Sequence, residues 1–406
     1  MRLRVEGPSG LPPKPPLLLP RDKLVLVKMR RSADPAGTVA VSVQPHFARH
    51  VAEAREQGVT DLAPVPDAEE IEAIIHAAFW ASLRREEGYV PTISLAFLPP
   101  SDSVRPLRFE HPFPLAPAPL ARLAPAVERP GIHLGVWREN EELYVWGTLR
   151  ELPAYCFVLE VIAPGLLVVK QSRVEEAAKY VNVAVLEGDN VKVLNEGAAS
   201  LPDCPTLVTS LLGFGSTQAS GKFSNVLVQL AVSMRAHGRG GSLLVVPGAS
   251  DTWRESIVHP VSYAVAPPFS ELAQLVRLGA TEQHERGWQD ALRRAVAAVA
   301  GLTAVDGATI ITDEYELLAF GAKIGRRDNS PRVEQVMVTE PIAGSEPAIL
   351  NTTQLGGTRH YSAAQFTHDQ RDALALVASQ DGQFTIFAWS PCEEMVHAHR
   401  VEALLL

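Results

Sequence analysis

The chain has 406 residues, of which 46% are hydrophobic and 20% charged, and its formal net charge is −9. This composition is typical of a folded globular protein rather than a disordered one, and the length predicts two domains. Nucleic acid as the main partner would require a basic face, which the negative balance does not favour.

Three widely separated cysteines, Cys156, Cys204 and Cys392, form neither a zinc-ligand spacing nor a disulfide framework. This usage indicates a reducing compartment. Prolines interrupt the apolar part of residues 1–20, which argues against a signal peptide and favours an extended lead-in. No stretch has the 18 or so apolar residues of a membrane span. We therefore expect a cytoplasmic protein with no membrane partner.

The N-terminal half predicts a helix followed by a group of strands. Asp67 and Glu70 have the spacing of a capping box and open a helix over Asp67–Gly88. Residues 101–130 are rich in proline and predict an irregular covering segment. Five β-rich runs predict a largely antiparallel sheet, and with it an α+β N-terminal domain. They are Thr92–Leu98, Ile132–Trp137, Leu143–Leu149, Cys156–Ile162 and Leu166–Val169.

The C-terminal half alternates helical and strand patterns, which predicts an α/β domain built on a mixed sheet flanked by helices. Helices are expected at Phe223–His237 and Trp288–Ala300. Strands are expected at Ser242–Pro247, Ala308–Thr312, Leu317–Lys323, Leu374–Ala378 and Phe384–Trp389. We place the domain boundary near 205–215, giving an N-terminal domain of 1–210 and a C-terminal domain of 211–406.

Asp306, Gly307 and Ala308 stand at the entrance of the apolar run Thr309–Ile311. A loop aspartate is most often a turn or cap residue. It can also hold a divalent metal, while the following glycine lets a ligand approach the backbone. Both interpretations are open for Asp306 taken alone.

A second block, Gly356-Gly357-Thr358-Arg359-His360, combines small backbone positions with a hydroxyl, a guanidinium and an imidazole. The simplest interpretation is a helix start with Thr358 as the cap. A helix N-terminus also binds anions, and Arg359 and His360 would add donors for a triphosphate. One carboxylate for a metal and this second block for phosphate suit nucleotidyl transfer.

The segment Ser379-Gln380-Asp381-Gly382 contributes two further candidate nucleotide-binding residues, Ser379 and Asp381. An Asp-Gly pair between two strands is equally typical of a plain hairpin turn. The segment Arg326–Asn351 could form a lid or a dimer contact.

Two other patterns are weaker. Gly213–Lys222 is glycine-rich, but it lacks both the glycine spacing and the hydroxyl residue after the lysine that a phosphate loop requires. His397 and His399 with Cys392 have no second pair of metal ligands, so we expect them in a solvated C-terminal end.

The Asp306–Ala308 and Gly356–His360 blocks together resemble the DGA and GTRHR motifs of the DisA-type diadenylate cyclase domain. Further blocks resemble the family in the same order, and the resemblance covers roughly residues 215–400. These blocks are Val226–His237, Gly240–Pro247, Asp372–Gly382 and Phe384–Phe387.

The resemblance implies that two ATP molecules are condensed to cyclic di-AMP and two pyrophosphates across a face-to-face dimer. It implies that Asp306 holds Mg²⁺ or Mn²⁺, while Arg359 and His360 contact the triphosphate. Gly307, Ala308, Gly357 and Thr358 would line the nucleotide site, and the N-terminal domain would be a sensor or regulatory module.

The chain departs from the family at Tyr361, where the motif has arginine, and at the shorter, less acidic turn Ser379–Gly382. These departures favour an alternative from another class of protein. In that alternative the chain is a nucleotide-binding sensor that kept the fold and lost catalysis.

Overall fold

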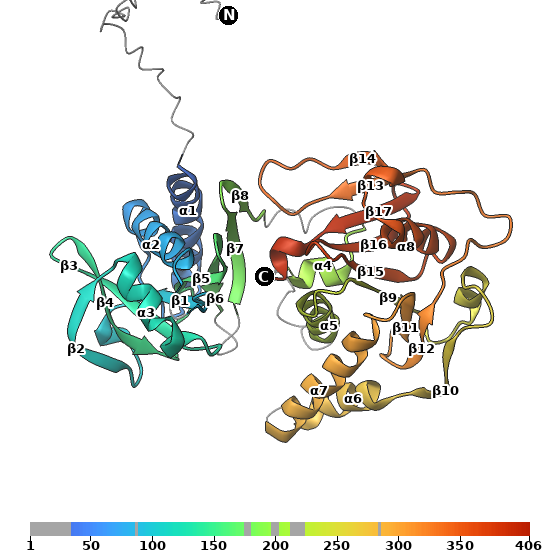
Figure 1. Cartoon of the computed structure of the whole chain (residues 1–406), viewed down its shortest axis with the longest axis horizontal. Coiled ribbons are helices and arrows are strands. Elements are labelled where there is room, and N and C mark those ends of the chain that lie inside the picture. Colours follow the sequence, from blue (N-terminus) through green and yellow to red (C-terminus); the bar gives the residue numbers. More distant parts are fainter. Residues whose placement is uncertain (1–33, 86–87, 174–179, 196–202, 212–223, 283–285) are drawn as a thin grey trace, which may run out of the picture. The chain divides into compact units, whose positions relative to one another are not determined.

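The computed structural model describes residues 34–85, 88–173, 180–195, 203–211, 224–282 and 286–406 (Figure 1). Apart from Asp34, the described residues belong to one unit, Pro35–Leu406. The expected lead-in over residues 1–20 and the glycine-rich segment Gly213–Lys222 lie outside the described residues.

The first half of this unit is built on an eight-stranded sheet in the order β2-β4-β3-β1-β5-β6-β7-β8. The β1–β3 pair is parallel and the other pairings are antiparallel. The strands are β1 (Ile93–Phe97), β2 (Leu107–Pro114), β3 (His133–Glu139), β4 (Glu142–Leu149), β5 (Phe157–Ala163), β6 (Leu166–Ser172), β7 (Tyr180–Glu187) and β8 (Asn190–Val193).

Three helices cover one face of this sheet: α1 (Pro35–Glu56), α2 (Ala68–Ser82) and α3 (Pro117–Val127). Successive residues of β1 point to opposite faces of the sheet. Leu95 packs into the helix-covered core, and Ala96 packs into a separate core on the other face. The predicted α+β architecture of this half is confirmed.

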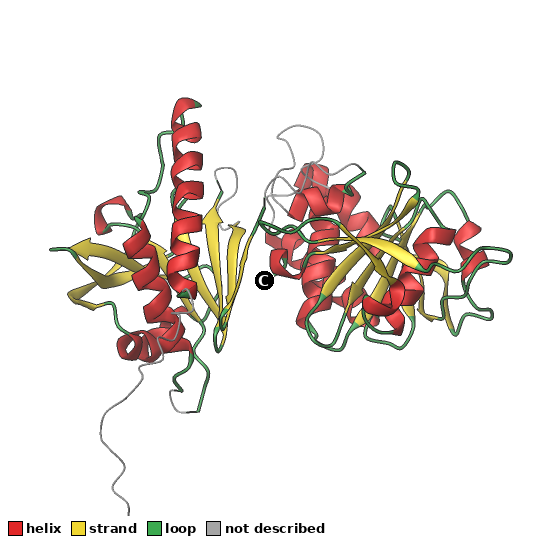
Figure 2. Ribbon diagram, turned by 90° about the horizontal axis from the view of Figure 1, so that it is seen from above, coloured by secondary structure: helices red, strands yellow, loops and turns green. Residues whose placement is uncertain are grey.

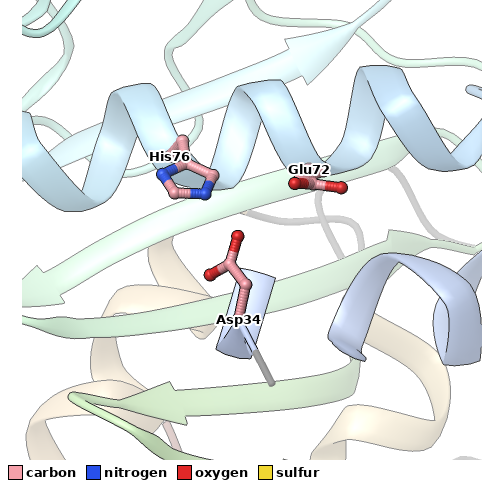
Figure 3. Close-up of side chains that lie close together, drawn as sticks. All are labelled: Asp34, Glu72 and His76. Atoms are coloured by element: carbon pink, nitrogen blue, oxygen red, sulfur yellow. The ribbon is translucent and has the colours of Figure 1, made fainter. Parts of the chain in front are cut away.

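The capping box predicted for α2 is present. Asp67 Oδ1 accepts from the Glu70 N–H at 2.8 Å, and Glu70 Oε2 accepts from the Asp67 N–H at 2.8 Å. Figure 3 shows the side chains of Glu72 and His76, one turn apart, on one side of this helix. The helix ends at Ser82 rather than at the predicted Gly88.

The prediction of an irregular segment over residues 101–130 is wrong, because this stretch contains β2 and α3. Most of the prolines stand in the first turn of α3 or in an edge strand, where the missing N–H costs little, and Pro125 lies inside α3 near its end. Helix α1 was not expected from the sequence, because its centre holds Pro45. Burial of an apolar stripe that includes Val39, Val43 and Phe47 outweighs that break.

The second half is built on a nine-stranded sheet in the order β10-β12-β11-β9-β15-β16-β17-β13-β14. The pairs β9–β11 and β13–β17 are parallel and the others antiparallel. The strands are β9 (Gly241–Val246), β10 (Tyr263–Phe269), β11 (Ala308–Thr312), β12 (Leu317–Ala322), β13 (Gln335–Thr339), β14 (Ala348–Asn351), β15 (Leu374–Ala378), β16 (Phe384–Ser390) and β17 (Met395–Arg400).

Helices lie on both sides of the second sheet (Figure 2). One core packs α4 (Thr206–Leu211), α5 (Ser224–Ala236), α6 (Glu271–Glu282) and α7 (Arg286–Leu302) against the sheet, and a second core packs α8 (Thr358–Asp369) against the other face. The predicted α/β fold with a mixed sheet is confirmed. No helix among the described residues has the length and apolar character needed to cross a membrane.

Two expectations for the C-terminal half change. His397 and His399 lie on β17 with only 5% and 1% of their surface exposed, so the expectation of a solvated C-terminal end is wrong. Val396–His399 are all buried in β17, and the two histidines hid this buried run in the sequence because polar side chains occupy interior positions. The segment Arg326–Asn351 contributes β13 and β14 to one side of the sheet, while its function as a lid or dimer contact stays a prediction.

A buried histidine in the first sheet predicts a pH dependence of stability. His133 is fully buried, with Nδ1 at 2.7 Å from Ser94 Oγ and Nε2 at 2.8 Å from the Tyr180 hydroxyl. Burial lowers the pKa of His133 to about 4, although nearby Glu160 opposes this shift. Between pH 6.5 and pH 4, His133 is protonated in the unfolded chain and stays neutral in the folded chain.

We therefore expect this group to reduce the free energy of unfolding by up to about 3 kcal/mol as the pH falls from 6.5 to 4. Urea unfolding of the full chain at several pH values measures the loss. The variant His133→Gln, which cannot titrate, should show a shallower pH dependence over this range. Equal pH dependence in the two proteins would contradict the assignment.

Candidate functional site

A cavity of about 770 Å³ opens at one end of the second sheet. Ser242 and Ala308 reach it from the first residues of the parallel pair β9 and β11, and Ala378 reaches it from the end of β15. The nine residues predicted to form a site all line this cavity: Asp306, Gly307, Ala308, Gly357, Thr358, Arg359, His360, Ser379 and Asp381. The structure brings these residues together, while their chemical functions stay predictions.

The start of α8 faces this cavity. Gly357, rather than the expected Thr358, is the N-cap, and it makes no side-chain capping bond. The first turn holds no acidic residue, so no side chain of its own neutralises the positive end of the helix dipole. Such an end is suited to an anion.

Glycine is required at Gly356 by its neighbours. Its φ of 145° lies where other residues are strained, and a Cβ there would stand 2.9 Å from His360 Nδ1. The second glycine of the block, Gly357, has open space around a Cβ. The first glycine therefore lets His360 pack against the chain that enters α8.

Glycine is also required at Gly307. The sequence suggested that it lets a ligand approach the backbone, but the close neighbour is another strand. The φ of Gly307 is 112°, and a Cβ would lie 2.4 Å from the carbonyl carbon of Gly321 on β12. The close approach is thus between two neighbouring strands. This contact holds the turn that carries Asp306 at the cavity wall.

Asp306 is exposed and forms an ion pair that the sequence analysis missed. Its Oδ2 lies 2.5 Å from Nζ of Lys323, which directly follows β12 and also lines the cavity. The hydrogen bond and charge of Lys323, followed by the more distant charge of Arg359, lower the pKa of the Asp306 carboxyl. The carboxylate is therefore ionised at neutral pH. The sequence signal was available, since Lys323 ends a predicted strand whose partner begins two residues after Asp306.

Arg359 and His360 differ in their environments. Arg359 makes no ion pair with any residue that the structure describes, and it lies beside Gly240, where a Cβ would stand 3.2 Å from its Nη1. His360 is 4% exposed, and its Nε2 has no hydrogen-bond partner within the described protein. Burial, followed by the charge of Arg400, lowers the pKa of His360, so the ring is neutral at pH 7. A guanidinium that has no counter-ion among the described residues suits an anionic ligand.

The turn Ser379–Gly382 connects the antiparallel strands β15 and β16, so it is a hairpin connection. Asp381 Oδ1 accepts a hydrogen bond from Ser379 Oγ within the turn. Both residues line the cavity, together with Gln380, which the sequence analysis did not select. The two interpretations of this turn are therefore compatible.

Tyr361 does not line the cavity. Its hydroxyl accepts a hydrogen bond from Nε of Arg332 at 2.7 Å, and the Arg332 guanidinium lies 5.2 Å from the ring centroid. The Arg332 guanidinium therefore lies against Tyr361 and, like Tyr361, is not part of the cavity wall.

Comparison with protein families gives a match in the first half of the chain. Residues 60–150 are similar to the family described as "Probable sensor domain DACNV", a domain associated with diadenylate cyclases. The match extends from the approach to α2 through β4, so it does not reach the cavity. No curated protein matches the chain.

The two glycines of the second block provide a matched test of this geometry. We expect Gly356→Ala to lower the free energy of unfolding by about 1–3 kcal/mol, because a Cβ would be strained and would displace His360. Gly357→Ala, with open space at the same motif, should lose only about 0.5 kcal/mol. Chemical unfolding of both variants compares them, and equal losses would show that the contact with His360 is unimportant.

The ion pair in the cavity predicts a second measurable effect. Lys323→Met removes the largest cause of the lowered Asp306 pKa, so that pKa should rise towards its ordinary value. Carboxyl-carbon NMR titration, with the Asp306 signal assigned through Asp306→Asn, measures the change. Arg326→Met, which removes an exposed cation that does not line this cavity, is the control and should leave the titration unchanged.

Proposed function

We propose that the C-terminal half is a diadenylate cyclase that condenses two ATP molecules into cyclic di-AMP and two pyrophosphates. One observation carries the proposal: the Asp306 turn and the first turn of α8, far apart in sequence, line one cavity. The cavity thus combines an ionised carboxylate, a helix N-terminus and a guanidinium that makes no ion pair with the residues that the structure describes. The similarity of residues 60–150 to a sensor domain associated with diadenylate cyclases supports the same function.

In this proposal the ATP triphosphate binds at the start of α8. The free N–H groups of the first turn and the Arg359 guanidinium offset the phosphate charge, and His360 lines the cavity beside them. The chain contributes mainly placement and electrostatic stabilisation, as is usual for reactions at phosphorus.

The residues present fit a divalent metal, Mg²⁺ or Mn²⁺. Asp306 is ionised and exposed, and one of its oxygens pairs with Lys323. Magnesium in nucleotide sites commonly takes one or two carboxylates and completes its ligands with phosphates and water. When bound, the metal would supply Lewis-acid stabilisation of charge at the phosphates. With Asp306 holding the metal, Lys323 would be available to pair with the phosphates.

The reaction needs two subunits. Each 3′-hydroxyl attacks the α-phosphate of the ATP held by the facing subunit, and each attack forms one phosphodiester bond and releases one pyrophosphate. We therefore propose a face-to-face homodimer, in which an isolated monomer binds ATP without cyclising it. The N-terminal half would regulate this step as the sensor domain, with a boundary near residue 210.

The second candidate is a nucleotide-binding sensor without catalysis. Two observations favour it. Lys323 forms an ion pair with Asp306, the proposed metal ligand, and Tyr361 stands where the family motif has an arginine. Incubation of the full chain with ATP and Mg²⁺ or Mn²⁺, followed by mass analysis of the products, distinguishes the two. Tight ATP binding without a cyclic product at concentrations that favour dimers would establish the sensor function.

We expect Asp306→Asn to reduce cyclic di-AMP formation by about 100-fold or more, because it removes the charge that holds the metal. The control Asp290→Asn changes an exposed aspartate on α7 that does not line the cavity, and it should keep the parental rate. Thermal unfolding checks that both variants remain folded. An unchanged rate in Asp306→Asn would show that Asp306 is only a turn residue and does not hold the metal.

A further inference from the structure

A second cavity, of about 610 Å³, lies at the other end of α8. Its walls include Val246 and Pro247, where β9 ends, and His368–Gln370, where α8 ends. The 12 residues of α8 place the two ends of this helix about 18 Å apart. In open α/β sheets, ligands bind preferentially at the carboxyl ends of parallel strands, and this cavity lies at the carboxyl end of β9.

Two arginines line this cavity. The guanidinium carbon of Arg371 lies 4.0 Å from the ring centroid of Trp389, and Arg371 makes no ion pair within the described part of the chain. Stacking keeps the guanidinium planar against the ring and leaves the N–H groups at its edge available. Arg327 uses Nε in an ion pair with Glu255 at 2.7 Å. Its terminal nitrogens remain available to a second anion.

Of the three carboxylates in the cavity wall, Asp369 holds the wall in place. Its side chain is fully buried, and it accepts from the Arg327 N–H at 2.9 Å, from Gln365 Nε2 at 3.0 Å and from the Ser330 hydroxyl. It therefore ties the segment before β13 to the end of α8. The exposed carboxylates of Asp328 and Asp372 remain as acceptors.

We propose that this cavity binds a sugar phosphate, with its phosphate held by Arg371 and Arg327. Both guanidinium groups can bind phosphate through paired N–H donors. Sugar hydroxyls would donate to Asp328 and Asp372, in the way that carboxylates bind ribose in nucleotide sites. The volume lies within the range of small-ligand pockets, about 300–1,000 Å³.

The site is also suited to control the first cavity. The backbone N–H of Arg327 donates to Asp369, the last residue of α8, while Thr358, Arg359 and His360 begin the same helix. A ligand that draws in the Arg327 side chain and shifts its backbone would act, through this hydrogen bond, on the helix that carries the phosphate-binding end of the first cavity. This coupling rests on the proposed nucleotide function, whereas sugar-phosphate binding does not.

Isothermal titration calorimetry of the full chain with ribose 5-phosphate tests the binding. Arg371→Gln should raise the Kd for ribose 5-phosphate about tenfold or more, because a hydrogen-bonded charge is lost. Arg326→Gln is the matched control, since it removes an exposed arginine next to Arg327 that does not line the cavity. Arg359→Gln, which alters the first cavity, should also leave this Kd unchanged.

The proposal is overturned if the Kd values of Arg371→Gln and Arg326→Gln agree, or if Arg359→Gln alone abolishes binding. Inorganic phosphate is the second probe, and it should bind more weakly than ribose 5-phosphate in the wild-type chain. Equal affinity for the two probes would refute the sugar part of the assignment.

Coupling is tested separately by measuring the Kd for ATP with and without saturating ribose 5-phosphate. We expect a change of about fivefold or more that is lost in Arg371→Gln. An unchanged Kd for ATP would refute the coupling while leaving the sugar-phosphate site intact. Failure of ATP to bind under both conditions would instead refute the proposed nucleotide function.

Discussion

The parallel pairing of β9 with β11 is the constraint on which both cavities depend. In register, Ser242 lies beside Ala308 and Val246 beside Thr312, so the two strands begin together and end together. The turn that carries Asp306 is thereby held at the starting end, and Val246 and Pro247 are held at the finishing end. The antiparallel neighbours β12 and β15 then bring Lys323 and Ser379 back to the end where Asp306 lies. A shift of one residue in this pairing would turn the side chains of the strand to the other face.

Close backbone contact makes this register specific. Gly307 approaches the backbone of Gly321 more closely than any side chain would allow, and both glycines have positive φ values. The contact sets the distance between the ends of β11 and β12, and with it the ion pair between Asp306 and Lys323. Gly307, which resembles part of a ligand site, is needed here because β11 and β12 could not approach this closely with a larger residue.

The two ends of α8 carry opposite partial charges from the helix dipole, and the protein treats them differently. At its start the positive end of the dipole is left for a ligand, since the first turn holds no carboxylate. At its end the buried carboxylate of Asp369 meets the negative end of the dipole, which is unfavourable. Its donors, among them the Arg327 N–H and Gln365 Nε2, offset that cost. The helix is therefore fixed by hydrogen bonds at one end, while its first turn remains available for binding.

Elements with strong local signals could be predicted from the amino-acid sequence. The capping box of Asp67 and Glu70, the amphipathic pattern of α7 and the apolar runs of β9, β11, β15 and β16 predicted these elements to within a few residues. The candidate residues from Asp306 to Asp381 could also be named from motif chemistry, although their functions remain predictions. The folded chain was needed to see that these residues line one cavity, that Lys323 pairs with Asp306, and that His397 and His399 are buried. These facts follow from strand order and from packing between segments distant in sequence. Propensity and periodicity report neither, because they describe each segment by itself.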